Sequence, residues 1–277
     1  MLLAAAGLAL LGLATGSFLT VVIRRTGTRS TIVWGRSRCP QCRRTLRWFE
    51  LLPILSFLLQ RGRCRSCRRP ISPLYPVVEF LCAFLFVALA VAVVRGVISP
   101  PPFSTDAVAG TLGTQVLWFL YYAFFSALAI AISAYDFERG LIPLALVRPL
   151  LVVGAGGALI RLAAGGGGRE VFALAAFAGA VFVLFWGLWF FSAGRAMGRG
   201  DADVALAIAL VLGPAAALTG LLFAFWIGAI LGILLVSVRR LGWSSEIPFA
   251  PFLFGGAIAA LFLSSALAPF NPFSYVF

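Results

Sequence analysis

The side chains best suited to catalysis are two aspartates that border apolar segments. Asp136 ends one segment, in AISAYDFERGLIP (131–143), and Asp201 opens another, in MGRGDAD (197–203). Two further apolar segments separate them, and an even number of crossings returns a chain to the same membrane face, so both carboxylates are predicted to lie at one depth. Such a pair can share a proton and activate a water for attack on an amide. One carboxyl acts as the base, while its protonated partner polarises the carbonyl and later protonates the leaving amine.

The chain contains no histidine and no lysine, so histidine-dependent and Ser-Lys chemistry are excluded. Gly198 and Gly200 are predicted substrate-side residues, because they let the backbone approach a substrate strand or adopt positive φ. Asp203 lies two residues beyond Asp201 and would point roughly 200° away on a helix. We interpret it as an acid favoured in a first helical turn by the helix dipole.

Four cysteines form a second candidate site. CPQC (39–42) and CRSC (64–67) are separated by 21 residues, a spacing that can bring four thiolates onto one zinc ion. The predicted ligands are Cys39, Cys42, Cys64 and Cys67. Two disulfides, an iron–sulfur site and an empty thiol site are the alternatives, and the predicted cytoplasmic side disfavours disulfides. No open ligand position is evident, so the zinc is expected to fold the loop rather than to catalyse.

One acid and one cysteine lie inside a single apolar segment. Glu79, in YPVVEF, is six residues into the segment that starts at Leu74. An ionisable group at membrane depth suggests a substrate-binding role, and a structural acid paired with an arginine is the alternative. Cys82 is interpreted as a small buried apolar residue.

The elements that position these residues are membrane helices. The chain is 62% hydrophobic and only 11% charged, which predicts an all-α polytopic membrane protein with about eight transmembrane helices and a small cytoplasmic zinc-binding loop. The expected spans are 2–23, 74–95, 113–135, 141–162, 171–193, 202–218, 219–238 and 248–268. Gly213-Pro214 is the only break between the sixth and seventh spans, and a failure to cross there would leave six or seven.

Charge placement predicts the orientation. All 22 basic residues are arginine, and thirteen of them lie between Arg24 and Arg69. The positive-inside rule therefore places this loop in the cytoplasm. The net charge of +13 is explained by anionic lipid headgroups beside the spans rather than by nucleic acid. The expected domains are a first span (1–23), a four-cysteine zinc-binding domain (24–73, the cysteine loop) and a transmembrane peptidase domain (74–277).

These motifs together resemble a known family. The chain is similar to the type IV prepilin peptidases, membrane aspartic proteases of the GxGD type. The matching segments, in the family's order, are GSFLTVVIRR (16–25), the two CxxC pairs with LRWFELLPILSF between them, DFERGLIP (136–143), GRGD (198–201) and EIPFAPFLFGGAI (246–258).

The resemblance implies that Asp136 and Asp201 are the catalytic pair and that the four cysteines bind zinc. It implies cleavage of the basic leader of prepilins or pseudopilins after a glycine, on the cytoplasmic side of a bacterial inner membrane. It also implies N-methylation of the new N-terminus with S-adenosylmethionine. No nucleotide-binding fingerprint supports the methyl transfer independently: GAGG (154–157) lies inside a predicted span, where small residues serve helix packing.

Three positions depart from the family's pattern. Asp203 replaces a usual lysine, Leu144 replaces an acid or asparagine, and PFAPF (248–252) replaces PFGPF. Substrate contacts near Asp203 are therefore expected to differ, whereas the aspartate pair is intact.

Two other interpretations remain. A presenilin or signal-peptide-peptidase type of protease also suits Tyr135-Asp136 and GRGD, but such enzymes carry a PAL motif that this sequence lacks and have no zinc loop. A non-catalytic zinc-bearing scaffold would use Asp136 and Asp201 in ion pairs with arginines.

Overall fold

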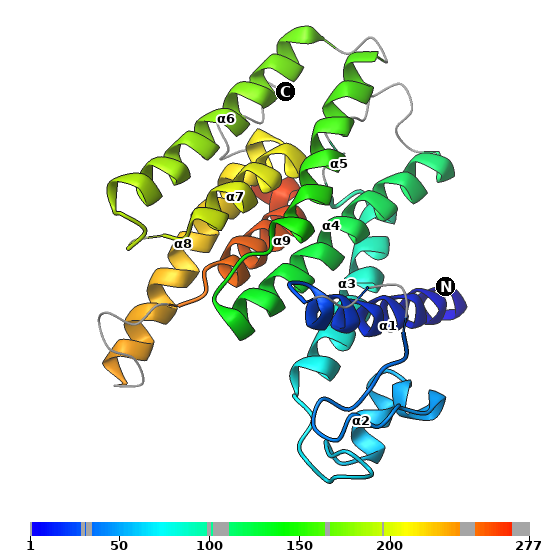
Figure 1. Ribbon diagram of the computed structural model, residues 1–277. Helices are drawn as coiled ribbons and strands as arrows, with labels where there is room; N and C mark the ends of the chain where they lie inside the picture. Colours follow the sequence, from blue (N-terminus) through cyan, green and yellow to red (C-terminus); the bar gives the residue numbers. More distant parts are fainter. Residues whose placement is uncertain are drawn as a thin grey trace. The chain divides into compact units, whose positions relative to one another are not determined.

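The described parts of the protein are mainly helical, and the non-helical residues are concentrated in the cysteine loop. The computed structural model describes residues 2–28, 31, 35–98, 101, 111–163, 167–195, 197–238 and 247–267 (Figure 1). The long helices are α1 (Leu2–Arg25), α3 (Leu74–Val94), α4 (Leu112–Arg139), α5 (Leu144–Ala163), α6 (Gly168–Phe191), α7 (Arg199–Leu212), α8 (Pro214–Ser237) and α9 (Ala250–Leu267). Each matches one predicted span. Glu246, the first residue of the last quoted motif, lies outside the described residues.

Six of these helices are long and apolar enough to cross a bilayer: α1, α3, α4, α5, α6 and α8. The chain is therefore a multi-pass membrane protein. Helix α7 has only 14 residues, about 21 Å at 1.5 Å per residue, which is short of the ~30 Å hydrocarbon core. The described apolar part of α9, Ala250–Leu263, is also short.

The boundary between the sixth and seventh predicted segments was misplaced. The expected division fell at 218/219, whereas α7 ends at Leu212 and α8 begins at Pro214. Proline has no N–H to continue α7, and its fixed φ suits the first position of a new helix. The carbonyl of Val211, left near this break, accepts a hydrogen bond from the Tyr121 hydroxyl at 3.0 Å.

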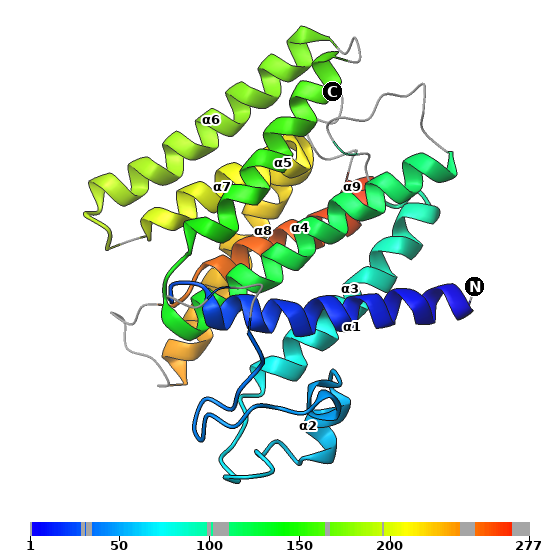
Figure 2. The same cartoon turned by 45° about the vertical axis from the view of Figure 1, so that its right-hand side comes forward.

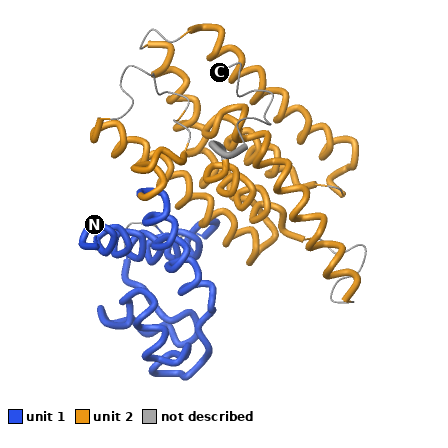
Figure 3. Tube along the Cα trace, turned by 180° about the vertical axis from the view of Figure 1, so that it is seen from behind, with its two compact units in different colours: residues 1–90 blue, residues 91–277 orange. Residues whose placement is uncertain are grey.

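The chain divides into two compact units, residues 1–90 and 91–277 (Figure 3). In the first unit, α1 and α3 pack closely, because a Cβ on Gly12 would lie 2.5 Å from Ala83 Cα and one on Gly16 would lie 2.6 Å from Glu79 Cα. Cys82 is completely buried, as expected for an apolar packing residue. Between α1 and α3 the cysteine loop contains the 3₁₀-helix η1 (Trp48–Leu51) and the short helix α2 (Leu55–Leu59).

The second unit is built around α7. Nine of its 14 residues are buried, because α7 contacts α5, α6, α8 and α9 (Figures 1 and 2). A Cβ on Gly154 would lie 2.7 Å from Leu210 Cβ, so this glycine of GAGG serves the close packing of α5 on α7. Helix α9 also contacts α4 and α8, and the unit thus assembles the ends of α4, α7 and α9.

Large apolar side chains remain exposed along the outer helices. Phe172 and Val183 on α6 are 73% and 65% exposed, and Ile230 on α8 is 68% exposed. Such surface would be unfavourable in water but matches lipid hydrocarbon. The exposed faces therefore agree with the membrane assignment from length and hydropathy.

Candidate active site and cysteine site

Asp136 is held at the end of α4 by two backbone contacts. Gly140 adopts φ +63° and ends the helix, and its N–H donates to the Asp136 carbonyl at 2.6 Å. The Ala250 N–H, at the start of α9, donates to Asp136 Oδ2 at 3.1 Å. The side chain is 5% exposed, so its orientation is fixed by α4 and α9 together.

Asp201 is fixed in the first turn of α7. Its Oδ2 accepts the Gly198 N–H at 3.0 Å, which satisfies one of the free donors at the helix start. Asp201 is also 5% exposed, and its Oδ1 is buried with no hydrogen-bond partner among the described residues. The two aspartates lie within electrostatic range of each other. The structure thus brings together both predicted catalytic carboxylates.

Gly200 connects the two aspartate motifs. A Cβ at this position would lie 2.7 Å from Ile142 Cβ, which is too close for any other residue. Ile142 belongs to the segment that follows Asp136, so the contact places the start of α7 against the end of the α4 motif. A Cβ on Gly198 would lie 3.2 Å from Asp201 Oδ2. Neither glycine needs positive φ, and the observed contacts are internal to the protein.

Two of the departures from the family pattern lie on the helices beside this site. Asp203 is partly buried and lies beyond the first turn of α7, where Asp201 is the acid of that turn, so the interpretation of Asp203 as a first-turn acid was wrong. It lies within electrostatic range of Arg199. Leu144 is 45% exposed and begins α5. The third departure is Ala250 of PFAPF, and its backbone N–H donates to Asp136, a bond that does not depend on which non-proline residue stands there.

The four predicted zinc ligands converge in the cysteine loop. Their sulfur atoms all lie within 4.8 Å of one another, and Cys39 Sγ is 3.9 Å from Cys67 Sγ. A tetrahedral zinc with Zn–S bonds of about 2.3 Å separates its sulfurs by about 3.8 Å, so the donor set fits. The cysteines are free thiols, which does not favour the disulfide alternative. Four cysteines can therefore hold a metal ion here.

Two copies of one turn present these sulfurs. Cys39 N–H donates to Arg44 O and Arg43 N–H donates to Cys39 O, both at 2.9 Å. Cys64, Arg68 and Arg69 repeat the same bonds at the same distances. Backbone N–H groups of Cys67 and Ser66 lower the pKa of the Cys64 thiol to about 6, and this favours the thiolate form that binds metals.

Glu50 stabilises the first half of the loop. Its Oε2 accepts the Arg47 N–H at 2.9 Å, and its Oε1 accepts from Arg44 Nη2 at 2.5 Å. Burial disfavours the charged form of Glu50, but these two donors outweigh burial and hold its pKa below the usual value. The negative charge of Glu50 is therefore balanced by Arg44 of the same loop.

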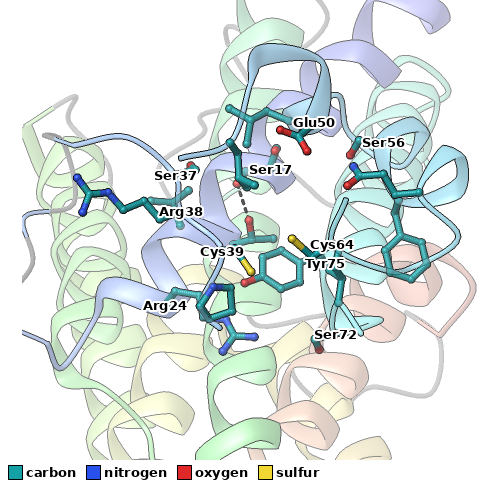
Figure 4. Close-up of a pocket in the computed structure, with 18 of the residues that line it drawn as sticks. Ser17, Arg24, Ser37, Arg38, Cys39, Glu50, Ser56, Cys64, Ser72 and Tyr75 are labelled. Atoms are coloured by element: carbon teal, nitrogen blue, oxygen red, sulfur yellow. Dashed lines mark hydrogen bonds between the residues drawn. The ribbon is translucent and has the colours of Figure 1, made fainter. Parts of the chain in front are cut away.

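Glu79 contacts the loop from α3. Its Oε2 accepts the Ile54 N–H at 2.7 Å, and Ile54 has φ +58°, a conformation that β-branched residues rarely adopt. Among the described residues, no arginine forms an ion pair with Glu79. The Ser17 side chain, labelled in Figure 4, also hydrogen-bonds with Glu79. Glu79 is thus held by hydrogen bonds rather than by the ion pair considered from sequence.

Sequence reasoning missed the role of Ala250. Its backbone N–H orients Asp136 from 114 residues away, and a backbone donor has no residue-type signature. The sequence did indicate that this segment matters, because Ala250 lies in PFAPF, one of the segments that match the family.

The fold and the paired carboxylates define a polytopic membrane protein with a two-aspartate site. Comparison with protein families identifies residues 10–93 as a bacterial peptidase A24 N-terminal domain and residues 123–233 as type IV leader peptidase family. The chain belongs to the type IV leader peptidase family. This membership does not favour the presenilin-type or scaffold interpretations.

Several relatives are named prepilin leader peptidase/N-methyltransferase. That of Aeromonas hydrophila is 35% identical over 230 residues, covering 82% of this chain and 71% of the relative. That of Bacillus subtilis (strain 168) is 32% identical over 259 residues and 94% of each chain. That of Burkholderia pseudomallei (strain 1026b) is 30% identical over 283 residues, 92% of this chain and 84% of the relative. No solved structure matches the chain.

Proposed function

We propose that this protein cleaves the basic leaders of prepilins or pseudopilins, with Asp136 and Asp201 as its catalytic pair. The observation that carries the proposal is the burial of two carboxylates, one each from α4 and α7, within electrostatic range of each other. Family membership and the names of the relatives support the substrate class.

The mechanism needs one ionised and one protonated carboxyl group. Asp201 Oδ1 has no donor among the described residues, so it is available to accept the proton of an attacking water. The backbone N–H groups of Gly198 and Ala250 donate hydrogen bonds that orient Asp201 Oδ2 and Asp136 Oδ2, respectively. Preorganisation of this kind would allow the two acids to hold a water and the scissile carbonyl between them.

We further propose that the new N-terminus is methylated with S-adenosylmethionine as donor, and that the four-cysteine site holds structural zinc. Zinc would supply folding free energy to a loop with little apolar core. The proposed arrangement is a first span (1–23), a four-cysteine zinc-binding domain (24–73) and a peptidase domain (74–277) in a bacterial inner membrane. Arginines of the cytoplasmic loop would face anionic lipid, and nucleic acid is not a proposed partner.

Replacement of each aspartate tests the peptidase proposal. Asp136→Asn and Asp201→Asn keep the side-chain shape but remove the acid, so cleavage of a prepilin should fall by about 1,000-fold or more, as expected for loss of acid–base catalysis. The measurement is the rate of leader removal by protein inserted in lipid nanodiscs. Asp203→Asn is the matched control and should retain most activity.

The two variants must also keep the wild-type thermal unfolding temperature. Cleavage at a wild-type rate by either folded variant would remove that aspartate from the mechanism.

A further inference from the structure

A non-helical segment, residues 140–143, connects α4 to α5 in the second unit. One end is fixed on the first aspartate motif, because the Gly140 N–H donates to the Asp136 carbonyl at 2.6 Å. The other end lies against the second motif, since a Cβ on Gly200 would be 2.7 Å from Ile142 Cβ. Gly200 directly precedes the second aspartate in the chain. The connecting segment therefore lies beside both aspartate motifs.

The main-chain polar groups of Leu141 and Ile142 are available for pairing. In the parts of the chain that the structure describes, neither N–H and neither C=O of these two residues has a hydrogen-bond partner. Leu141 is 65% exposed, whereas Ile142 is partly buried. The residue before a proline is restricted to the extended region, which favours an extended chain before Pro143. Exposed extended backbone with unpaired donors and acceptors is a template for a further strand.

The other non-helical segments at this site offer fewer main-chain groups. Both groups of Gly198 are used by Asp201: the Gly198 N–H donates to Oδ2, and its C=O accepts the Asp201 N–H. Before α9, Pro248 has no N–H, and the C=O of Phe249 accepts from two N–H groups of α9. Among the described residues near the two aspartates, Leu141 thus presents an exposed donor and an exposed acceptor on one residue.

Hydrolysis of a peptide bond requires access to that bond. In a helix each amide is hydrogen-bonded to the next turn and is surrounded by side chains, whereas an extended chain leaves the scissile carbonyl open to an attacking water. Pairing with an exposed strand edge holds a peptide in this extended form, and its affinity comes from main-chain hydrogen bonds. A two-aspartate site that cleaves polypeptides therefore needs such an edge nearby.

We propose that the main chain of Leu141 pairs with the cleavage-site segment of the precursor and holds that segment as an extended strand. One substrate residue donates its N–H to the Leu141 C=O and accepts the Leu141 N–H through its own C=O, as in a hydrogen-bonded pair of antiparallel strands. The inference rests on the proposed peptidase function and adds how the substrate is held. Because main-chain groups are common to all sequences, this contact accepts precursors whose side chains differ.

Removal of single N–H groups from the substrate provides a direct test. Peptides that span the leader cleavage site of a prepilin would carry one ester in place of one amide, at each residue near the scissile bond in turn, while the scissile bond itself stays an amide. Wild-type protein in nanodiscs would be assayed for KM and kcat. An ester at the paired residue should raise KM about fivefold, as expected for the loss of one hydrogen bond.

The pattern along the peptide is specific to a strand. Neighbouring amides of a strand point in opposite directions, so esters at the residues on either side of the paired residue should change KM by less than about twofold. Equal KM values across the whole series would overturn the proposal, and so would equal increases at consecutive residues.

Proline variants test the same contact from the side of the enzyme. Leu141→Pro removes the N–H and should raise KM about fivefold or more, while kcat stays within about twofold of the wild type. Leu144→Pro is the matched control, because it removes an N–H at the first position of α5, where proline is tolerated. The control should keep the wild-type KM. A folded Leu141→Pro protein with the wild-type KM would overturn the proposal, and if that variant does not fold, the ester series decides.

The same assays separate this inference from the peptidase proposal. Wild-type protein that removes leaders from every ester peptide with one KM would refute the strand pairing alone. An Asp136→Asn protein that still removes leaders, with the ester pattern of the wild type, would refute the proposed peptidase pair alone.

Discussion

Ile142 and Gly200 show how two sequence motifs become one site. The 2.7 Å approach of a Cβ at Gly200 to Ile142 Cβ means that only a hydrogen fits at this point. The start of α7 can therefore rest directly on the segment that follows Asp136. The distance between the carboxylates depends on this contact as well as on the helices that carry them.

Gly200→Ala is predicted to impair cleavage more than it impairs folding. The added methyl must push the first turn of α7 away from Ile142, and overpacking of this kind costs about 1–3 kcal/mol. A displacement of about 1 Å near the chemistry can lower activity by about 100-fold. Cleavage rate and thermal unfolding should be measured for Gly200→Ala and for Gly179→Ala, whose Cβ meets nothing within 4 Å.

The control, Gly179→Ala, should match the wild type in cleavage rate and in thermal unfolding. Full activity of Gly200→Ala would show that this contact does not position the site.

For individual residues, the sequence predicted which residues form the site better than it predicted their contacts. Asp136 and Asp201 could be predicted to lie at the same depth, because two intervening apolar segments return the chain to the same membrane face. The Ala250 N–H could not be predicted, since any non-proline residue carries the same donor. Gly200 was expected to face substrate, yet its contact partner lies 58 positions earlier, at Ile142, and only the tertiary structure brings them together.

Helices α8 and α9 illustrate packing between elements. A Cβ on Gly256 would overlap Gly220 O and would lie 2.7 Å from Ala224 N. Both contacts are backbone atoms, which cannot move aside as a flexible side chain can. Close approach through small residues is a main source of helix association in lipid. Because α9 also carries Ala250, this packing supports the orientation of Asp136.

Gly256→Ala is predicted to lower the thermal unfolding temperature. Separation of α8 from α9 should cost about 1–3 kcal/mol, and tryptophan fluorescence of the nanodisc-inserted protein can follow the transition. Gly255→Ala changes the neighbouring residue of the same helix, where a Cβ meets nothing within 4 Å. That control should unfold as wild type does. Identical unfolding of the two variants would contradict the close-packing argument.

The helices were predictable because long apolar runs have few alternatives in a membrane. The boundary at Gly213-Pro214 was recognised as a break, but the expected spans were extended past it to reach about 20 residues each. The structure instead keeps α7 short. Its burial among four neighbouring helices removes the need for a full crossing, and such packing is not visible in hydropathy.

The two compact units have different sources of stability. The second unit, residues 91–277, is a helix bundle with a continuous apolar interior. The cysteine loop of the first unit contains only one 3₁₀-helix and one five-residue α-helix among its described residues. Its order therefore depends on the Glu50 and Glu79 hydrogen bonds and on the convergence of four thiols.

Metal removal is predicted to unfold the cysteine loop and leave the second unit folded. A chelator should speed proteolysis between residues 35 and 73, because metal binding supplies much of the folding free energy of such a loop. Mass spectrometry would locate the cuts, and zinc released per chain would be measured in parallel. Cys82→Ser is the control, since this cysteine lies outside the cluster.

Cys64→Ser should reproduce the chelator's effect without a chelator. The structural-metal proposal would be contradicted if well under one zinc were released per chain. It would also be contradicted if proteolysis of the loop were equally slow before and after chelation.

The hydrogen bonding of Asp201 has a practical consequence. Among the described residues, Oδ2 accepts the Gly198 N–H and Oδ1 has no partner, so an asparagine can keep that bond through its carbonyl oxygen and place its amide where Oδ1 lies. Asp201→Asn should therefore behave as a substrate trap, which holds an uncleaved precursor in a folded enzyme. Such a stalled complex would be stable enough for co-purification and imaging, and it would reveal how a pilin enters the site.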